Sequence, residues 1–213
     1  MFTDSPNLIK LGDMSYVYKN FIDKDTIEKI NMSINSEKRN SRNHEIDWYS
    51  DKTSLSLNSL ISVWNKVNDF LHPHYVTTPS LFLNIMEPGD EPMFIHADSP
   101  GEDGHDQVLE NDSWGTCPLI SWGIVVYFGN FEGGEIFYPQ FDIEYSPRPG
   151  DMIIHSAFTP WEHGVRPVIS GKRYAYSLFA LETHKNPGSF YNYGTKECEI
   201  AQKDPDTWIM PLI

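Results

Sequence analysis

Cysteine is scarce in this sequence, which has only Cys117 and Cys198 among 213 residues. Two distant cysteines exclude a disulfide framework and a CxxC motif, so we expect a reducing, cytoplasmic setting. Long apolar runs are also missing, since no stretch approaches the roughly 18 residues of a membrane span. The opening MFTDSPNLIK lacks the basic-then-apolar design of a signal peptide. We therefore expect no membrane association.

Basic residues are few, with 16 Lys and Arg against 30 Asp and Glu and a net charge of −14. Such a charge repels phosphate backbones at long range, so nucleic acid is not an expected partner. An acidic surface can attract a basic peptide, or it can serve solubility alone. Both interpretations stay open.

What the sequence does contain is enough apolar material for a core, at 39% hydrophobic and 14% aromatic residues. The alternating, aromatic-rich stretch 14–22 predicts a strand. Asp25, with Glu28 three residues on, has the pattern of a capping box at the start of a short helix. Apolar residues recur at helical spacing over 54–71. The polar segment 36–52 between these two helices predicts a loop.

Short apolar or alternating runs, separated by Gly, Pro, Asn and Asp, follow one another after residue 78. They predict eight strands: 80–86, 92–97, 119–129, 134–139, 141–147, 151–157, 163–169 and 172–181. Eight short strands in two sheets match a double-stranded β-helix, or jelly roll. We predict a mainly β fold with flanking helices (α+β) in one domain, 1–213. It comprises N-terminal support (1–78), the jelly-roll core (79–183) and a C-terminal packing segment (184–213).

The stretch FIHADSP, residues 94–100, places His96 and Asp98 two residues apart behind an apolar run. Residues i and i+2 of a strand point to the same side, so these two side chains suit adjacent ligand positions on one metal. A reactive ferrous site takes two histidines and one carboxylate. His163, which opens a later β-branched run, is our candidate for the third ligand. A co-substrate that binds the metal at one end and has a free carboxylate at the other needs a cation opposite the metal. Arg173, ten residues further on, is our candidate, because its planar guanidinium matches a carboxylate.

Each of these candidates has rivals. His155 lies eight residues before His163 and could take its place, although we expect it to line the pocket instead. Arg166 and Lys172 are the rival cations. Lys172 and Arg173 are neighbours, so in a strand they face opposite sides and a slip of one residue would exchange them.

Taken together, these motifs resemble the iron(II)/2-oxoglutarate-dependent dioxygenases, with the closest likeness to the prolyl 4-hydroxylase branch. MEPGDEPMFIHAD resembles that branch's approach to its H-x-D pair, and IVVYFGNFEGGEIFYP resembles its strand, turn and EGGE segment. YSPRPGDMIIH resembles its strand leading to the distal histidine. The likeness covers residues 80–182. It is specific in combination, whereas H-x-D alone is weak.

The resemblance implies that His96, Asp98 and His163 hold iron(II) and that Arg173 pairs with the distal carboxylate of 2-oxoglutarate. It also implies O2 as co-substrate, ascorbate as a possible reductant, and hydroxylation of a C–H bond. A proline of a peptide or protein is the leading substrate, and a free amino acid or small metabolite is the alternative. A non-catalytic, cupin-like metal-binding module is the alternative of another class.

This sequence departs from the family where a tyrosine that commonly helps to hold 2-oxoglutarate is replaced by Met86. Methionine cannot donate that hydrogen bond, and Tyr127 on the long predicted strand is our candidate replacement. The acidic stretch 99–118 is long for a connection between strands. It follows two candidate ligands, so it should border the site, where it could select a basic substrate or remain a solvated loop. Oligomeric state is not indicated by the sequence.

Overall fold

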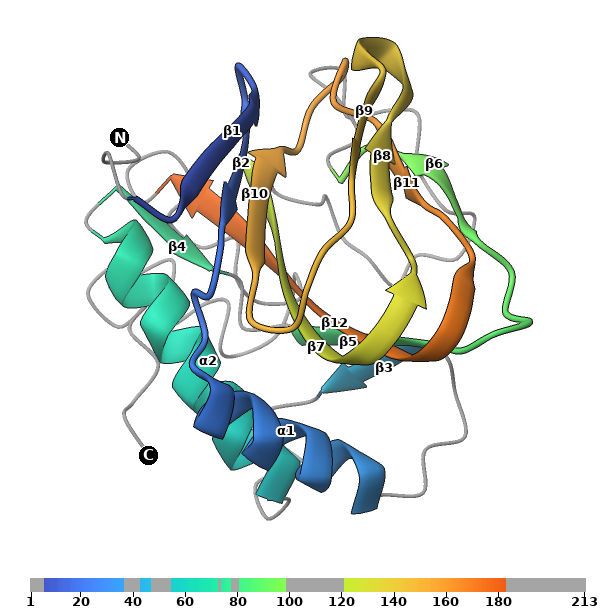
Figure 1. Cartoon of the computed structure of the whole chain (residues 1–213). Coiled ribbons are helices and arrows are strands. Elements are labelled where there is room, and N and C mark those ends of the chain that lie inside the picture. Colours follow the sequence, from blue (N-terminus) through green and yellow to red (C-terminus); the bar gives the residue numbers. More distant parts are fainter. Residues whose placement is uncertain are drawn as a thin grey trace, which may run out of the picture.

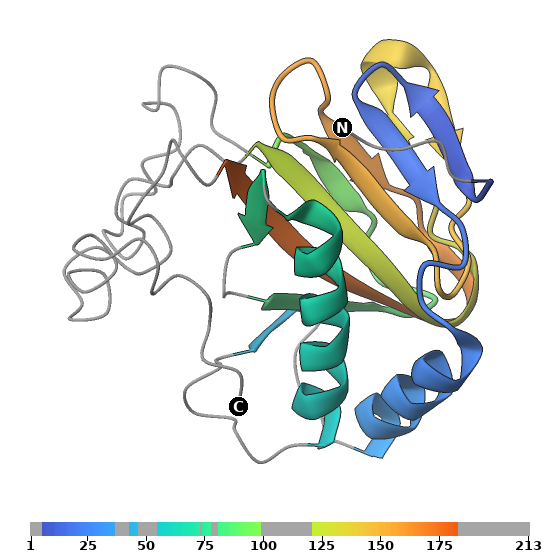
Figure 2. The same ribbon diagram turned by 90° about the vertical axis from the view of Figure 1, so that its left-hand side faces the viewer.

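The computed structural model describes residues 6–36, 43–46, 55–72, 74–77, 81–98 and 121–182. Two antiparallel sheets face each other, and two helices lie against the outer face of the larger sheet (Figures 1 and 2). This arrangement is the predicted mainly β jelly roll with N-terminal helical support. The acidic stretch 99–118 and the segment 184–213 lie outside the described residues.

The N-terminal part contributes both helices and four strands. The strands are β1 (Leu8–Gly12), β2 (Ser15–Tyr18), β3 (Asn43–Ile46) and β4 (Tyr75–Thr77), and the helices are α1 (Lys24–Ser36) and α2 (Leu55–Leu71). The two predicted helices and the strand within 14–22 are confirmed. The prediction of a loop over 36–52 is wrong at 43–46, where β3 pairs with β5 at an edge of the large sheet. This pairing is a tertiary contact, which outweighs the weak strand propensity of the segment NHEI.

The predicted cap of α1 is displaced by two residues. Asp23, not Asp25, precedes the helix, and its carboxylate accepts hydrogen bonds from the Thr26 backbone N–H (2.9 Å) and hydroxyl (2.8 Å). Asp25 lies inside the first turn. The cap therefore satisfies a backbone donor that has no partner within the helix.

Replacing Asp23 with alanine is expected to lower the melting temperature by about 2–4 °C, since the first turn of α1 loses its acceptor. Differential scanning calorimetry measures the shift. Asp25→Ala is the matched control, because it removes a carboxylate from the same turn but no cap. An equal shift in both variants would contradict the assignment of Asp23 as the cap.

All eight strands predicted after residue 78 are present. They are β5 (Leu81–Met86), β6 (Met93–His96), β7 (Trp122–Gly133), β8 (Ile136–Tyr138), β9 (Ile143–Tyr145), β10 (Met152–Ser156), β11 (His163–Val165) and β12 (Val168–Glu182). A single 3-10 turn, Pro139–Phe141, joins β8 to β9. The large sheet runs β1-β2-β10-β7-β12-β5-β3, with β4 paired to β12. The small sheet runs β6-β11-β8-β9. β12, the last strand described, thus lies between β7 and β5.

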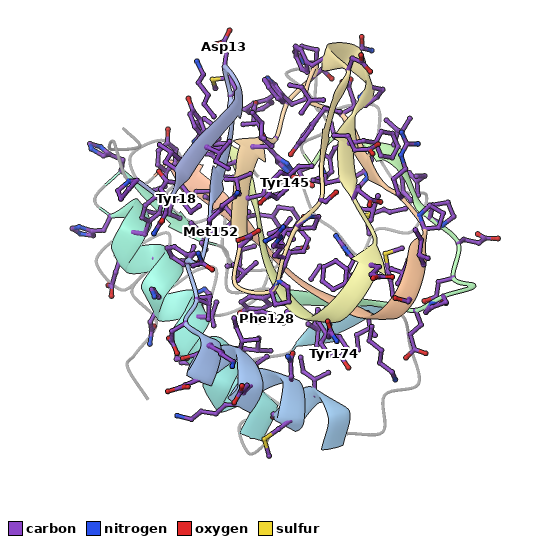
Figure 3. All side chains as sticks on the ribbon, in the orientation of Figure 1. Asp13, Tyr18, Phe128, Tyr145, Met152 and Tyr174 are labelled. Atoms are coloured by element: carbon purple, nitrogen blue, oxygen red, sulfur yellow. The ribbon has the colours of Figure 1, made fainter. Side chains whose placement is uncertain are left out.

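Alternation along β7 and β12 divides the interior into two layers. Ile124, Val126 and Phe128 pack toward the helices, together with Tyr174 and Tyr176 of β12. Their neighbours in the strands turn the other way and face the small sheet, where a second cluster includes Val17, Tyr127, Ile136 and Ile153. Side chains from the strands project into both spaces (Figure 3). Residues that alternate with the helix-facing core therefore point to the space between the sheets, which is where the candidate site lies.

None of the helices in the described segments is both long and apolar enough to cross a membrane. The interpretation of the whole chain as one domain stays a prediction.

Candidate active site

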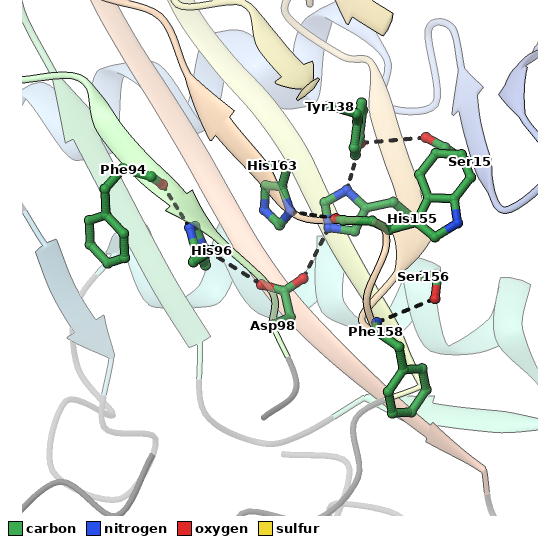
Figure 4. A network of polar contacts seen from close by, with 10 residues as sticks. Ser15, Phe94, His96, Asp98, Tyr138, His155, Ser156, Phe158 and His163 are labelled. Atoms are coloured by element: carbon green, nitrogen blue, oxygen red, sulfur yellow. Dashed lines mark hydrogen bonds and ion pairs between the residues drawn. The ribbon is translucent and has the colours of Figure 1, made fainter. Parts of the chain in front are cut away.

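The structure brings His96, Asp98 and His163 together. β6 ends at His96, Asp98 lies in the bend that follows, and His163 is directly opposite His96 on β11. One potential ligand atom from each of the three residues lies within 4.8 Å of the others. The pairing of β6 with β11 thus joins the two halves of the predicted site. Figure 4 shows the three side chains converging.

Each of the two histidines is oriented by the backbone carbonyl of the residue two positions before it. His96 Nδ1 lies 3.0 Å from the carbonyl oxygen of Phe94, and His163 Nδ1 lies 3.4 Å from that of Trp161. A carbonyl oxygen only accepts, so Nδ1 carries the proton in each ring and donates it. Nε2 is then the nitrogen with a free lone pair. This is the usual way in which a metal-binding histidine is held in one tautomer.

Burial and neighbouring charge shape the protonation of the cluster. Burial alone would raise the pKa of Asp98, but the hydrogen bond from His155 and the charges of His155, His163 and His96 hold its pKa below the usual value. Burial, followed by the neighbouring His155, lowers the pKa of His163 to about 3. Asp98 is therefore ionised and His163 neutral at neutral pH. Those are the forms that bind a metal.

The burial of neutral His163 gives a pH prediction for the metal-free protein. The unfolded chain protonates this histidine below about pH 6.5, whereas the folded protein does so only below about pH 3. Between these values the unfolded state therefore binds one more proton than the folded state. As the pH is lowered through this range, the unfolding free energy should decrease by up to about 1.4 kcal/mol per pH unit. Urea unfolding at pH 7.5, 6.5, 5.5 and 4.5 measures the slope. His163→Asn should flatten it, and an unchanged slope would contradict this origin.

A cavity of about 290 Å³ lies between the two sheets and connects the cluster with Arg173. His96, Asp98 and His163 line it together with Arg173 and Tyr127. Much of the remaining lining is apolar and comes from both sheets: Met93, Val125, Ile136, Val165, Ala175 and Phe179. The cavity can therefore enclose a small molecule that bridges the cluster and the guanidinium.

Arg173 is the buried cation of the three candidates. Its side chain is 2% exposed, whereas Lys172 pairs with Glu87 and Arg166 with Glu144 at the surface. Arg173 is directly opposite Met86 on β5, with Nη1 3.7 Å from Met86 Sδ and 3.5 Å from Asn84 Oδ1. Met86 thus lies directly beside the buried cation.

Tyr127 also lies close to the guanidinium, whose Cζ is 5.0 Å from the centre of the tyrosine ring. Burial raises the pKa of Tyr127, and the nearby Arg173 offsets part of that rise. Gly134 leaves room for the side chain of Arg173, because a Cβ at that position would lie 2.7 Å from Arg173 Cδ. The EGGE motif therefore has a steric role at this site.

Three residues of the site escaped sequence reasoning in their actual roles. His155 is fully buried and contacts Asp98 rather than lining the open cavity, and Tyr138 and Ser15 extend that contact (Figure 4). The inward orientation of His155 is expected from the sequence, whereas its contact with Asp98 is not. Nothing local marks Ser15 or Tyr138, which come from β2 and β8.

No family model matches the chain, and no curated protein matches its sequence. Solved structures do match. The viral collagen prolyl hydroxylase of Paramecium bursaria Chlorella virus-1 is 16% identical with a TM-score of 0.56, over 84% of this chain and 94% of that one. A second structure of that hydroxylase is its 2OG complex.

Two further solved structures are similar to this chain. A prolyl hydroxylase from Trichoplax adhaerens, bound to a peptide fragment of the hypoxia inducible factor oxygen degradation domain, is 12% identical with a TM-score of 0.54, over 81% of this chain and 85% of that one. NgTET1 bound to 5mC DNA is 16% identical with a TM-score of 0.51, over 78% of this chain and 71% of that one. The chain shares the double-stranded β-helix fold of these proteins. A fold does not determine a substrate.

Proposed function

We propose that this protein is an iron(II)- and 2-oxoglutarate-dependent dioxygenase that hydroxylates a C–H bond. One observation carries the proposal: two histidine side chains and a carboxylate converge in the same cavity as a buried arginine. Two histidines and one carboxylate are the donor set of non-haem iron(II) oxygenases. A surface cluster or a vestigial module has no need of the buried cation.

Each residue has a role in this proposal. His96, Asp98 and His163 hold iron(II), and Arg173 pairs with the far carboxylate of 2-oxoglutarate, with Tyr127 beside it. The bound iron supplies oxidising chemistry by which R–H, O2 and 2-oxoglutarate become R–OH, succinate and CO2. The chain itself orients the co-substrate between the two ends of the cavity. Its apolar lining excludes water from the reacting centre.

We propose a proline in a peptide or protein as the substrate. Three of the matching structures are of prolyl hydroxylases, and one of those holds a peptide. The net charge of −14 supports a basic peptide over nucleic acid, since it repels a phosphate backbone. A free amino acid or small metabolite is the competing substrate class.

The enzyme proposal is tested without knowledge of the substrate. Anaerobic addition of iron(II) and 2-oxoglutarate should produce a weak visible charge-transfer band, and admission of air with ascorbate should release succinate. Absence of both signals would refute the proposal. Succinate release across a panel of proline-containing peptides, matched peptides with alanine for proline, and free amino acids then identifies the substrate. Stimulation by free amino acids alone would overturn the peptide assignment.

A further inference from the structure

A chain of buried polar groups runs from the carboxylate of Asp98 into the core (Figure 4). Asp98 Oδ1 faces His96 Nε2 at 3.8 Å, while Asp98 Oδ2 lies 3.0 Å from His155 Nε2. His155 Nδ1 is 2.6 Å from the hydroxyl of Tyr138, which accepts a hydrogen bond from Ser15 Oγ at 3.4 Å. The two oxygens of Asp98 thus have different neighbours.

The direction of these hydrogen bonds follows from their acceptors. An ionised carboxylate only accepts, so His155 Nε2 must carry a proton where it meets Asp98. With a single proton on the ring, Nδ1 is then an acceptor, and the hydroxyl of Tyr138 is the donor that faces it. Tyr138 therefore selects the tautomer of His155 that can donate to Asp98.

The surrounding structure is shaped around this contact. Ser15, Tyr138 and His155 are all fully buried, where a polar group that loses its partner is costly. Gly123 on β7 is directly opposite His155 on β10. A Cβ at Gly123 would overlap both Asp98 Oδ2 and His155 Nε2. The absence of a side chain at Gly123 of β7 thus leaves the space in which the hydrogen bond between Asp98 and His155 lies.

We infer that His155, oriented by Tyr138, is a positioning residue that holds Asp98 Oδ2 and turns Oδ1 alone toward the metal. The inference rests on the proposed iron site. With iron(II) bound, Asp98 would then be a one-oxygen ligand, and a further coordination position would stay available to the co-substrate or O2. His155 itself is engaged by Asp98 and lies outside the three-residue ligand cluster found among the described residues.

The test measures metal affinity without turnover. Cobalt(II) is titrated into the metal-free protein under visible absorption, which reports affinity and coordination together. His155→Leu should weaken cobalt binding by about 10- to 100-fold, the usual effect of removing the partner of a ligand. His155→Gln places an amide N–H near Asp98 and should recover most of that loss. Tyr138→Phe should have an intermediate effect, because it frees the tautomer but keeps the ring.

Tyr176→Phe is the matched control for Tyr138→Phe. It also removes a fully buried tyrosine hydroxyl, but from β12 of the large sheet, on the side that faces the helices and away from Asp98. Cobalt affinity should be unchanged in this variant. Urea unfolding of every variant separates lost affinity from lost folding, and the glutamine variant decides the question if His155→Leu does not fold.

The outcomes are distinct. Failure of the parent protein to bind cobalt(II) and iron(II) contradicts the proposed function itself. A parent that binds, with His155→Leu and His155→Gln both within twofold of it, leaves the function intact and overturns the positioning role. Equal losses in both His155 variants, with a cobalt spectrum that reports one nitrogen ligand fewer, would make His155 a ligand and also overturn it.

Discussion

Asp98→Ala is expected to abolish both metal binding and succinate release. Asp98 supplies the only carboxylate in the candidate ligand cluster. Its side chain lines the cavity and is 8% exposed. Removing the partner of a ligand typically costs 10–100-fold, so removing the ligand itself should lower turnover by at least about a thousandfold. Iron(II) titration and succinate release at saturating 2-oxoglutarate measure the two effects.

Asp69→Ala is the control for this change. Asp69 is an exposed carboxylate on α2, at the helical layer behind the large sheet, so its loss should alter neither signal. Retention of the charge-transfer band or of succinate release by Asp98→Ala would show that the ligand assignment is wrong. Circular dichroism shows whether Asp98→Ala is folded. If it is, lost metal binding reflects the lost ligand and not a lost fold.

Arg173→Met is expected to raise the KM for 2-oxoglutarate by at least about thirtyfold while iron(II) affinity is kept. The fold-change corresponds to the loss of about 2 kcal/mol, at the lower end for one partner of a buried, hydrogen-bonded charge pair. Methionine fills much of the same space and leaves no buried charge behind, so the fold should be retained. Initial rates of succinate release over a range of 2-oxoglutarate concentrations give the KM.

Lys172→Met provides an unusually close control. Lys172 precedes Arg173 on β12 but points outward, where it pairs with Glu87 and is about half exposed. This variant carries the same loss of one positive charge, yet the KM for 2-oxoglutarate should stay within twofold of the parent. Equal effects of the two substitutions would mean that net charge, and not a contact in the cavity, controls co-substrate affinity.

Local pattern was sufficient to predict much of the core. The strands of the jelly roll show short apolar runs bounded by turn residues, and the convergence of His96 with Asp98 follows from the period of a strand and a bend after it. Strand parity indicates that only one of Arg173 and Lys172 faces the interior, and the choice of Arg173 comes from the spacing in the family that the sequence resembles; the buried position of Arg173 agrees with it. These features depend on a few neighbouring residues, so the sequence displays them directly.

The rest depends on contacts between segments that are far apart in the chain. The sequence pattern favours Asp25 as the cap of α1, and only the hydrogen bonds to Thr26 identify Asp23 in that role. The strand β3 exists by pairing with β5. The hydrogen bonds around Asp98 join residues of β2, β8 and β10 to the bend after β6. Periodicity along the chain does not predict such long-range contacts.

The central position of β12 has a consequence for the order of assembly. In the described part of the large sheet, β12 alone joins the group β1-β2-β10-β7 to the group β5-β3. It is also the last of the described strands to be synthesised, and it carries Arg173. Pairing between distant segments is slow, and domains emerge from synthesis N-terminus first. A growing chain can therefore present its two histidines before its arginine, and the capacity to hold the co-substrate is acquired only when this last strand enters the middle of the sheet.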